Sequence, residues 1–373
     1  MNEVRIGIIG CGIIATQHME NYAQLDGHRV VAICDIDEAK MNAFGDRFGV
    51  ARRFTHIGEL LRCDDIDAVD VCLHNNLHAP VTIEALRRGK HVYCEKPMAG
   101  SWADAKAMLD AARETGKMLH IQLAFLYTNE TRAARRFVDF GRLGKLYHMR
   151  SYGFRRRGRP YVDGYATKEF VNTHTAAGGA MFDMGVYHIS QLLYLSHLPK
   201  LERITGHTYA EVELDPVRRE ISGFNVEELG CGFATFEGGL TMDILESWAI
   251  HGAPFPGSIL AGSQGGLRLD PLSFHTLIED MQVDTTVDLG AMRYRNDTVY
   301  GETESHYNSS QKHWLSALRG VCPLLNTAEI ALDTQLLQEG IYLSHALGRE
   351  VTADEIRTMS VSKAIEVPNL YLK

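Results

Sequence analysis

A glycine pattern near the N-terminus constrains this chain more than any other feature. The apolar run Val4–Ile9 leads directly into the hexapeptide GCGIIA at residues 10–15, which has the spacing G-x-G-x-x-A. Gly10 permits a tight strand-to-helix turn, Gly12 lets a pyrophosphate approach the backbone, and Ala15 lets the helix pack closely on the strand. The pyrophosphate then lies at the helix N-terminus, where free N–H groups and the helix dipole favour negative charge. The pattern predicts a dinucleotide-binding Rossmann domain.

The end of the next strand indicates which dinucleotide is bound. The run that ends at Cys34 is followed by Asp35, at a distance from Gly10 close to the usual spacing of about 20 residues. Asp35 would hydrogen-bond the ribose hydroxyls and repel a 2′-phosphate, and the neighbouring Ile36 and Asp37 supply no arginine to bind one. These residues favour NAD over NADP. The alternative is that Asp35 only caps the following helix.

Short apolar runs alternate with amphipathic stretches up to about residue 122. The runs that we interpret as strands are Val4–Ile9, Arg29–Cys34, Ala68–Leu73, Lys90–Cys94 and Lys117–Gln122. A helical segment follows each of the first four, most clearly between Ser101, which resembles an N-cap, and Gly116, which closes the helix. This alternation predicts a doubly wound parallel sheet with helices on both faces.

The pattern changes after residue 122. The later segments are a helix at 131–140, a strand at 146–154, an irregular stretch, a helix at 181–195, strands broken by turns over 201–289, and helices at 307–319 and 328–347. This order predicts a second α/β domain with a large, mostly antiparallel open sheet. We therefore expect an NAD-binding Rossmann domain at residues 1–123 and a substrate-binding and oligomerisation domain at residues 124–373, with the site in the crevice between them.

Composition excludes several classes of partner. The net charge of −9 argues against nucleic acid, which requires a basic face. No apolar run reaches the roughly 18 residues of a membrane span, and the N-terminal run is too short for a signal peptide. The seven cysteines include no C-x-x-C pair and lie mostly in apolar segments, which is typical of reduced thiols in a cytoplasmic protein.

A Glu-Lys-Pro element follows the predicted strand that ends in HVYC, at residues 91–94. Open α/β sheets bind ligands at the carboxyl ends of parallel strands, and Pro97 stops the strand and fixes the turn. Lys96 would then point into the cofactor crevice. An oxidised nicotinamide and partial burial would favour the neutral amine there, which can take a proton from a substrate hydroxyl. The alternative is a solvated lysine in a turn.

Four segments spread over the chain share the motifs of one family. They are GIIGCGIIA near the start, HNNLHAPVTIEALRRGKHVYCEKP, GRLGKLYHMRSYGF, and AGGAMFDMGVY at residues 177–187. Each motif is common by itself, but the combination is specific. It resembles the Gfo/Idh/MocA oxidoreductases, a family that includes glucose–fructose oxidoreductase and inositol dehydrogenase.

The resemblance implies a Rossmann domain followed by an α/β domain whose open sheet forms the contact of a homodimer or homotetramer. It implies NAD(P) as cofactor, and sugars, cyclitols or their derivatives as substrates. It places Lys96 as catalytic and Asp183 as the group that holds the substrate or the lysine. The predicted cofactor contacts are Gly10, Gly12, Ile13, Ile14, Asp35, Asn75, His78, Glu95 and Lys96.

Asp183 and Tyr187 are four residues apart and therefore share one face of a helix. Most family members have histidine where Tyr187 stands, whereas glucose–fructose oxidoreductase resembles this chain in having tyrosine. We interpret Tyr187 as the substrate-facing proton donor or hydrogen-bonding partner. His188, about 100° further around the helix, is a lesser candidate whose alternative is a buried core histidine.

The irregular stretch before this helix contains RRRGRP at residues 155–160. A charge run usually marks a solvated face, but long loops inside compact domains are often functional. Similar Arg-rich loops occur in sugar-acting members of the family, and the resemblance suggests that this loop covers the substrate. Arg156, Lys168 and His174 are the predicted substrate contacts in this region.

Two departures from the family pattern concern the nicotinamide side. The usual Thr-Pro-Asn loop reads Leu73-His74-Asn75, and the arginine that many members carry after the last Rossmann strand is missing from QLAFLYTNE. His74 and His78 have a spacing that suits a metal, but no third ligand is evident nearby, so we expect no metal.

These observations together favour hydride transfer between NAD and a secondary hydroxyl of a sugar, glycoside or cyclitol. Lys96 would be the general base, with Asp183 and Tyr187 orienting the hydroxyl. The first alternative is a glycosidase that keeps NAD bound and uses transient oxidation. The second is a non-catalytic NAD-binding regulator.

Overall fold

The computed structural model describes residues 3–299, 305–367 and 370. The chain divides into two units. The first contains the described residues up to Gln122, residues 309–329 and the described residues after Ser360; the second contains 123–308 and 330–360. The sequence pattern placed everything after residue 123 in the second domain, whereas the chain returns twice to the first unit. None of the described helices is both long enough and apolar enough to cross a lipid bilayer.

The first unit is a six-stranded parallel sheet with the strand order β3-β2-β1-β4-β5-β6. Its strands are β1 (Val4–Ile9), β2 (His28–Cys34), β3 (Arg53–Phe54), β4 (Ala68–Val71), β5 (His91–Cys94) and β6 (Leu119–Ile121). Its helices are α1 (Ile13–Tyr22), α2 (Glu38–Phe48), α3 (Ile57–Leu61), α4 (Asn75–Arg87), α5 (Trp102–Thr115) and α13 (Ser310–Leu318). The strand order reverses between β1 and β4, which is where doubly wound sheets bind dinucleotides.

Local signals in the sequence explain the ends of these elements. The Ser101 side chain accepts the Asp104 N–H and caps α5, and Gly116 ends the helix with a φ of 64°. A left-handed residue of this kind favours glycine, because glycine has no Cβ. The predicted helix is therefore confirmed within a residue of its bounds. The two-residue strand β3 carries no periodic signal and was not predicted.

Helix α13 completes the core of the first unit. Trp314 is fully buried, and its ring lies 5.1 Å from the ring of Tyr93 on β5. The Tyr93 hydroxyl donates to Ser310 Oγ at 2.9 Å. Leu315 and Leu318 pack in the same cluster as β1 and α1. The first unit therefore takes part of its core from residues that follow most of the second unit in the sequence.

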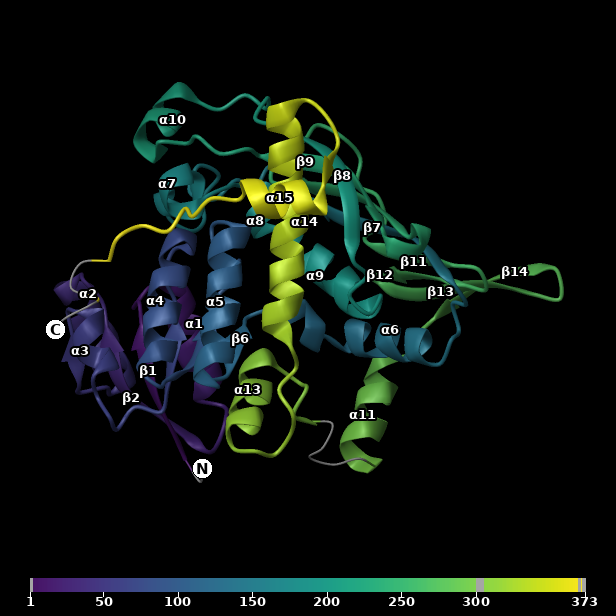
Figure 1. The fold of residues 1–373 in the computed structure, drawn as a ribbon. Helices are drawn as coiled ribbons and strands as arrows, with labels where there is room; N and C mark the ends of the chain where they lie inside the picture. The colour runs from purple at the N-terminus through teal and green to yellow at the C-terminus, as the bar shows by residue number, and fades with distance from the viewer. Residues whose placement is uncertain (1–2, 300–304, 368–369, 371–373) are drawn as a thin grey trace. The chain divides into compact units, whose positions relative to one another are not determined.

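The second unit is built on a nine-stranded sheet with the order β14-β13-β12-β11-β7-β10-β9-β8-β15. Its strands are β7 (Leu146–Phe154), β8 (Leu201–Tyr209), β9 (Leu229–Phe236), β10 (Thr241–Ser247), β11 (Ile259–Gly262), β12 (Gly266–Leu269), β13 (Leu272–Ile278), β14 (Met281–Thr286) and β15 (Val351–Thr352). All neighbours are antiparallel except β7 and β10, which confirms the predicted, mostly antiparallel sheet. The β13–β14 hairpin extends beyond the rest of this sheet (Figure 1).

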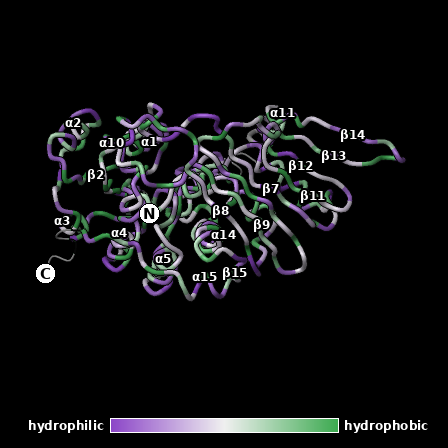
Figure 2. The backbone as a smooth tube through the Cα atoms, turned by 90° about the horizontal axis from the view of Figure 1, so that it is seen from above, coloured by the Kyte–Doolittle hydropathy of each residue, from purple (hydrophilic) through white to green (hydrophobic). Residues whose placement is uncertain are grey.

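Helices of the second unit position the candidate site residues. They are η1 (Ala124–Tyr127), α6 (Asn129–Asp139), η2 (Lys168–Val171), α7 (Thr173–Ala176), α8 (Ala180–Asp183), α9 (Gly185–Leu195), α10 (Pro216–Ser222), α11 (Leu289–Val299), α14 (Thr327–Leu347) and α15 (Ala353–Met359). Figure 2 looks along α14 and shows it beside β8 and β9. A side chain at Gly206 or Gly232 would meet Ile341 of α14 at 2.9 or 3.1 Å, so these glycines let the helix lie close to the sheet.

Candidate active site

The glycine turn has the form that the fingerprint predicted. Gly10 has a φ of 94°, and a Cβ there would lie 2.3 Å from the carbonyl oxygen of Cys72, so only glycine fits. Around Gly12, the only atom within 4 Å of an added Cβ, among the described residues, is Lys40 Nζ at 3.8 Å. The space beside Gly12 is thus open to a ligand, and no side chain caps the N-terminus of α1. The residues fit a dinucleotide pyrophosphate at this turn.

Asp35 links the end of β2 to the glycine turn. Its Oδ2 accepts the backbone N–H of Cys11 at 2.7 Å, and its Oδ1 accepts the N–H of Asp37 at 2.9 Å. The N-cap of α2 is Asp37, whose side chain accepts the Lys40 N–H, so the cap is not Asp35. Each Asp35 oxygen retains a second lone pair for a ribose hydroxyl. Contact of Asp35 with the cofactor itself stays a prediction.

Lys40 adds a positive charge at this corner that the sequence pattern did not reveal. Its Nζ lies 3.4 Å from Asp35 Oδ2. Lys40 is the cation, among the described residues, that lies beside the open space at Gly12. Asp35 therefore neutralises the positive charge next to the glycine turn. This pairing leads to a prediction about cofactor choice.

Asp35→Ser is expected to weaken NADH binding about tenfold, through the lost hydrogen bonds to ribose, and to strengthen NADPH binding. The reason is that Lys40, released from its carboxylate, is free to pair with a 2′-phosphate. Titration of nicotinamide fluorescence measures both dissociation constants. The double variant Asp35→Ser/Lys40→Ala is the control, and it should lose the gain in NADPH affinity. An unchanged preference in Asp35→Ser would contradict the assignment of Asp35 to the ribose.

Glu95 is part of a buried chain of hydrogen bonds that ends at Lys96. His18 Nε2 lies 2.9 Å from Glu95 Oε1, and His18 Nδ1 lies 2.9 Å from Asp70 Oδ2. Tyr22 donates its hydroxyl to Asp70 at 2.9 Å. The second oxygen of Glu95 accepts the backbone N–H of Lys96 at 3.0 Å. We call these four residues, Tyr22, Asp70, His18 and Glu95, the His18 chain.

The His18 chain carries charge in the interior of the first unit. Burial is the largest single effect and lowers the pKa of His18, but the interactions with Asp70 and Cys72 together outweigh it and raise the pKa well above 6.5. Burial opposes ionisation of Glu95, yet the hydrogen bond from His18 and the charge of Lys96 hold its pKa below the ordinary value. An imidazolium thus lies between two carboxylates, a buried arrangement that fixes geometry because each partner depends on the others.

His18, Asp70 and Cys72 are the one group among the described residues whose ligand atoms lie close enough together for a metal ion. Their atoms instead bond to each other, since Cys72 Sγ lies 3.4 Å from His18 Nδ1 and 3.3 Å from Asp70 Oδ1. These contacts place Cys72 beside the His18 chain.

His78 and Asn75 lie on α4, behind the same turn. His78 is fully buried, with Nδ1 2.8 Å from the carbonyl oxygen of Pro97 and Nε2 3.0 Å from that of Leu73. Burial lowers the pKa of His78, so the ring is neutral at neutral pH. The structure thus gives His78 a supporting role beneath the Glu-Lys-Pro turn. Asn75 is buried at the first position of α4. Their contact with a cofactor stays a prediction.

In the second unit, Asp183 ends α8 and is held by a tryptophan. Trp248, which is fully buried, donates its indole N–H to Asp183 Oδ2 at 2.9 Å. Helix α8 is itself held at its start by buried Glu227, which accepts the N–H groups of Gly179 and Met181 at 2.8 and 2.9 Å. The sequence analysis missed both Trp248 and Glu227, because each contacts α8 from a segment that is distant in the sequence.

Tyr187 and His188 lie in the first turn of α9 and differ in their contacts. The ring of Tyr187 lies 5.0 Å from the ring of Phe125. His188 Nδ1 lies 3.0 Å from Glu246 Oε2, and Glu246 is fully buried on β10. Burial lowers the pKa of His188, but the Glu246 carboxylate outweighs burial and raises it above 6.5. His188 is thus a hydrogen-bonded partner of a buried carboxylate that favours its protonated form.

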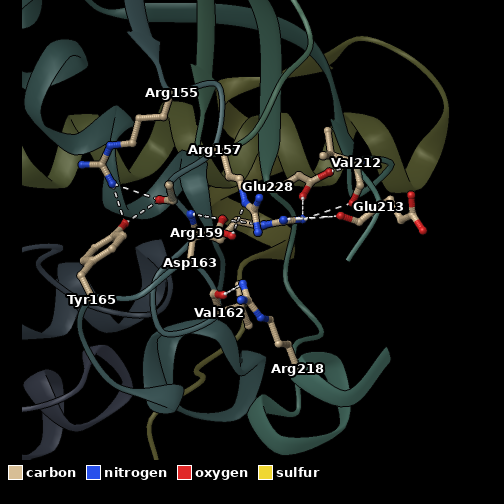
Figure 3. A network of polar contacts seen from close by, with 11 residues as sticks. Arg155, Arg157, Arg159, Val162, Asp163, Tyr165, Val212, Glu213, Arg218 and Glu228 are labelled. Carbon is tan, nitrogen blue, oxygen red and sulfur yellow. Dashed lines mark hydrogen bonds and ion pairs between the residues drawn. The ribbon is translucent and has the colours of Figure 1, made fainter. Parts of the chain in front are cut away.

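The Arg-rich loop is a packed network (Figure 3). Arg159 is 2% exposed and pairs with Asp163 at 2.9 Å and with Glu228 at 3.1 Å. Arg157 also pairs with Asp163, at 3.0 Å. Arg155 donates to the Gly158 carbonyl at 3.3 Å. The loop is therefore held by its own arginines, and these three are already used within it.

The predicted substrate contacts of this region lie on its surface. Arg156, Lys168 and His174 are exposed. Among the described residues, Arg156 has no hydrogen bond or ion pair, in contrast to the arginines on either side. Asp183 and Tyr187 were expected on one face of a single helix, but the helix divides at Met184, so Asp183 ends α8 and Tyr187 lies on α9. Both belong to the second unit, while Lys96 belongs to the first. Substrate contact of each of these residues stays a prediction.

A doubly wound parallel sheet with an open glycine turn, followed by a mostly antiparallel sheet, defines a class of two-domain dinucleotide-dependent oxidoreductases. Residues 4–123 match the Gfo/Idh/MocA oxidoreductase family, described as an NAD-binding Rossmann fold. Residues 131–268 match a Gfo/Idh/MocA C-terminal domain. The chain belongs to this family, which confirms the resemblance, and its cofactor is NAD.

Curated relatives include several dehydrogenases. The chain is 25% identical over 361 residues to D-glucoside 3-dehydrogenase of Escherichia coli K12, covering 93% of this chain and 97% of the relative. It is also 25% identical to D-apiose dehydrogenase of Paraburkholderia graminis, covering 92% and 88%. Myo-inositol 2-dehydrogenase of Thermotoga maritima is 30% identical over 147 residues, covering 39% and 44%.

Solved structures show the same fold. An oxidoreductase domain protein from Kribbella flavida has a TM-score of 0.80 at 19% identity and covers 95% of this chain and 100% of its own. The WlbA dehydrogenase from Bordetella pertussis, solved with NADH and UDP-GlcNAcA, has a TM-score of 0.76 at 22% identity, covering 94% and 98%.

Proposed function

We propose that this protein oxidises a secondary hydroxyl of a sugar, glycoside or cyclitol with NAD, and that Lys96 is the general base. The observation that carries the proposal is the His18 chain, which ends at the backbone of Lys96 just beyond the carboxyl end of β5. A lysine fixed by a buried charged chain at the ligand-binding edge of the sheet is difficult to explain as a solvated turn residue.

The reaction divides between cofactor and protein. Bound NAD supplies the hydride acceptor, and the residues at Gly10, Gly12 and Asp35 would hold it. The positive charge of bound NAD would favour the neutral amine of Lys96, which would then take the proton of the substrate hydroxyl as the carbinol carbon gives up its hydride, so that the alcohol becomes a ketone. Asp183, fixed by the Trp248 indole, accepts a hydrogen bond from a substrate hydroxyl, and Tyr187 orients the reacting one.

The named activities of the relatives support the substrate class. A glucoside, apiose and inositol share a secondary hydroxyl on a ring or on a short polyol chain, and the relatives that carry these names are dehydrogenases. Full-length coverage of the glucoside enzyme argues that both units act together in the same type of reaction.

A panel of hexoses, methyl glycosides, sugar acids and inositols tests the proposal, with the absorbance of the reduced nicotinamide as the readout. We expect stoichiometric NADH with at least one member. Cleavage of a glycoside without accumulation of NADH would instead establish the redox-neutral glycosidase. Neither reduction nor cleavage with any member would reject the enzyme in favour of an NAD-binding regulator.

A further inference from the structure

A cavity of about 310 Å³ lies within the second unit, next to α9, the helix that carries Tyr187. We call it the His188 cavity. Residues from η1, α6, β7, α9 and the β10–β11 and β12–β13 connections line it, among them Phe125, Glu130, Tyr152, His188 and Asp270. Asp183 and Tyr187 are not part of its lining. Its volume falls at the lower end of the roughly 300–1,000 Å³ of small-molecule sites, which suits a single ring.

His188 presents a fixed donor to this cavity. Its Nδ1 is 3.0 and 3.2 Å from the two Glu246 oxygens, and Glu246 also accepts the Ser151 hydroxyl at 2.7 Å. The carboxylate thus holds the ring in one orientation and favours its protonated form. The other ring nitrogen, Nε2, has no partner among the residues that the structure describes. Because Nδ1 is held by Glu246, the protonated ring offers its Nε2–H as a donor to a molecule in the cavity.

The remaining lining determines what the occupant is. Glu130 and Asp270 supply carboxylate oxygens to the lining. Neither carboxylate has a hydrogen bond or ion pair with a residue that the structure describes. The described lining contains no lysine or arginine. Phosphate and carboxylate groups are therefore disfavoured, because two carboxylates would repel them. Hydroxyl groups suit the lining, since they donate to carboxylates and accept from His188, while the rings of Phe125 and Tyr152 offer apolar faces.

The Phe125 ring lines the cavity and also contacts Tyr187, one of the candidate catalytic residues. Phe125 lies 5.0 Å from Tyr187 and 5.5 Å, edge-on, from His188, measured between ring centroids. It therefore stands between the residue that we assign to the reacting hydroxyl and the cavity. A substrate with two linked rings can place one ring at Tyr187 and the other beyond Phe125.

We propose that the His188 cavity is a subsite for a second, uncharged sugar ring, so that the preferred substrate is a glycoside whose aglycone is itself a sugar. This proposal rests on the proposed dehydrogenase function. It gives His188 a role in substrate selection, distinct from the proton transfer assigned to Lys96.

The test compares matched methyl monoglycosides and methyl diglycosides of glucose, galactose, mannose and xylose. Two quantities are measured: kcat/KM for NAD reduction, and the dissociation constant from the NADH-loaded protein by calorimetry. In the wild type, at least one diglycoside should have a kcat/KM about tenfold higher and a dissociation constant about tenfold lower than its monoglycoside, the effect of one or two added hydrogen bonds. Glu130→Gln/Asp270→Asn, at a partly exposed and an exposed position, and His188→Gln should each abolish this ratio. Glu211→Gln, an exposed carboxylate outside the cavity, should preserve it.

Equal constants for every mono- and diglycoside pair would overturn the subsite, as would a diglycoside advantage that survives both cavity variants. Failure of the dehydrogenase function has a separate signature. In that case no member of the panel reduces NAD, yet the calorimetric comparison on the NADH-loaded protein still decides whether a second ring binds. A tighter binding of methyl glucuronide than of methyl glucoside, lost in His188→Gln, would show an anion site and also overturn the proposal.

Discussion

Lys96→Met is expected to lower kcat by about 10²- to 10⁴-fold, the usual contribution of a general base, while NADH binds with nearly wild-type affinity. Methionine has nearly the length of lysine but cannot take a proton, so only the proton transfer is lost. Lys96→Arg should be as inactive as Lys96→Met, because a guanidinium stays protonated at any accessible pH. Steady-state kinetics and fluorescence titration of NADH measure the two effects separately.

The matched control for this variant is Lys106→Met, on α5 of the same unit. Lys106 pairs with Asp110 on the helix surface, at 2.6 Å, and it should be kinetically silent. In the wild type and in the control, kcat/KM should fall towards acidic pH as the general base becomes protonated. If this fall is absent from the residual activity of Lys96→Met, the titrating group is Lys96. An arginine variant with wild-type activity would reduce the role of Lys96 to a positive charge.

His18→Leu is expected to destabilise the first unit by about 3–5 kcal/mol, the cost of removing one partner from a buried ion pair. The substitution leaves Asp70 and Glu95, which are fully buried or nearly so, without the cation that lies between them. Urea unfolding monitored by exchange of β4 and β5 amides reports on this unit alone. His91→Leu on β5 is the comparison, since burial lowers the pKa of His91 to about 4 and the ring carries no charge at neutral pH. We expect about 1 kcal/mol there, for one lost hydrogen bond.

The dependence of this effect on pH and on Asp70 distinguishes charge from packing. The pKa of His18 is raised in the folded protein, so its contribution is complete below about 6.5, the value in the unfolded chain, and is lost as pH rises through the folded value. The difference between wild type and His18→Leu should therefore narrow in alkaline solution. In an Asp70→Asn background the cost of His18→Leu should be smaller, as a double-mutant cycle will show. A cost that is independent of both would mean that His18 only fills space.

The elements with strong local signals were predictable from the sequence. Gly10 to Ala15 identified the dinucleotide turn, because a positive φ and a close approach can be met only by glycine. The strand Leu146–Phe154 and the helix between Ser101 and Gly116 followed from apolar runs and caps. These features depend on neighbours in the chain, so the amino-acid order records them directly.

The supports of the candidate site depend on distant residues and left no such record. His18 reads as one polar residue on an amphipathic helix, and nothing near it in the sequence indicates that Asp70 and Glu95 lie on either side. Trp248 and Glu227 likewise act on α8, from the loops that follow β10 and precede β9. The arginine run suggested ligand contact because charge density is visible in a sequence, whereas the pairing of Arg159 with Glu228 is not.

The return of α13 to the first unit has a consequence for synthesis of the chain. Tyr93 and Ser310, which share a hydrogen bond, are 217 positions apart. A ribosome that makes the chain from the N-terminus therefore releases all six strands of the Rossmann sheet long before Trp314 arrives to cover Tyr93. Because long-range contacts form slowly and leave apolar surface open meanwhile, the domain that is translated first is the one that waits for a late segment. Nascent chains halted before residue 309 should present this surface to chaperones.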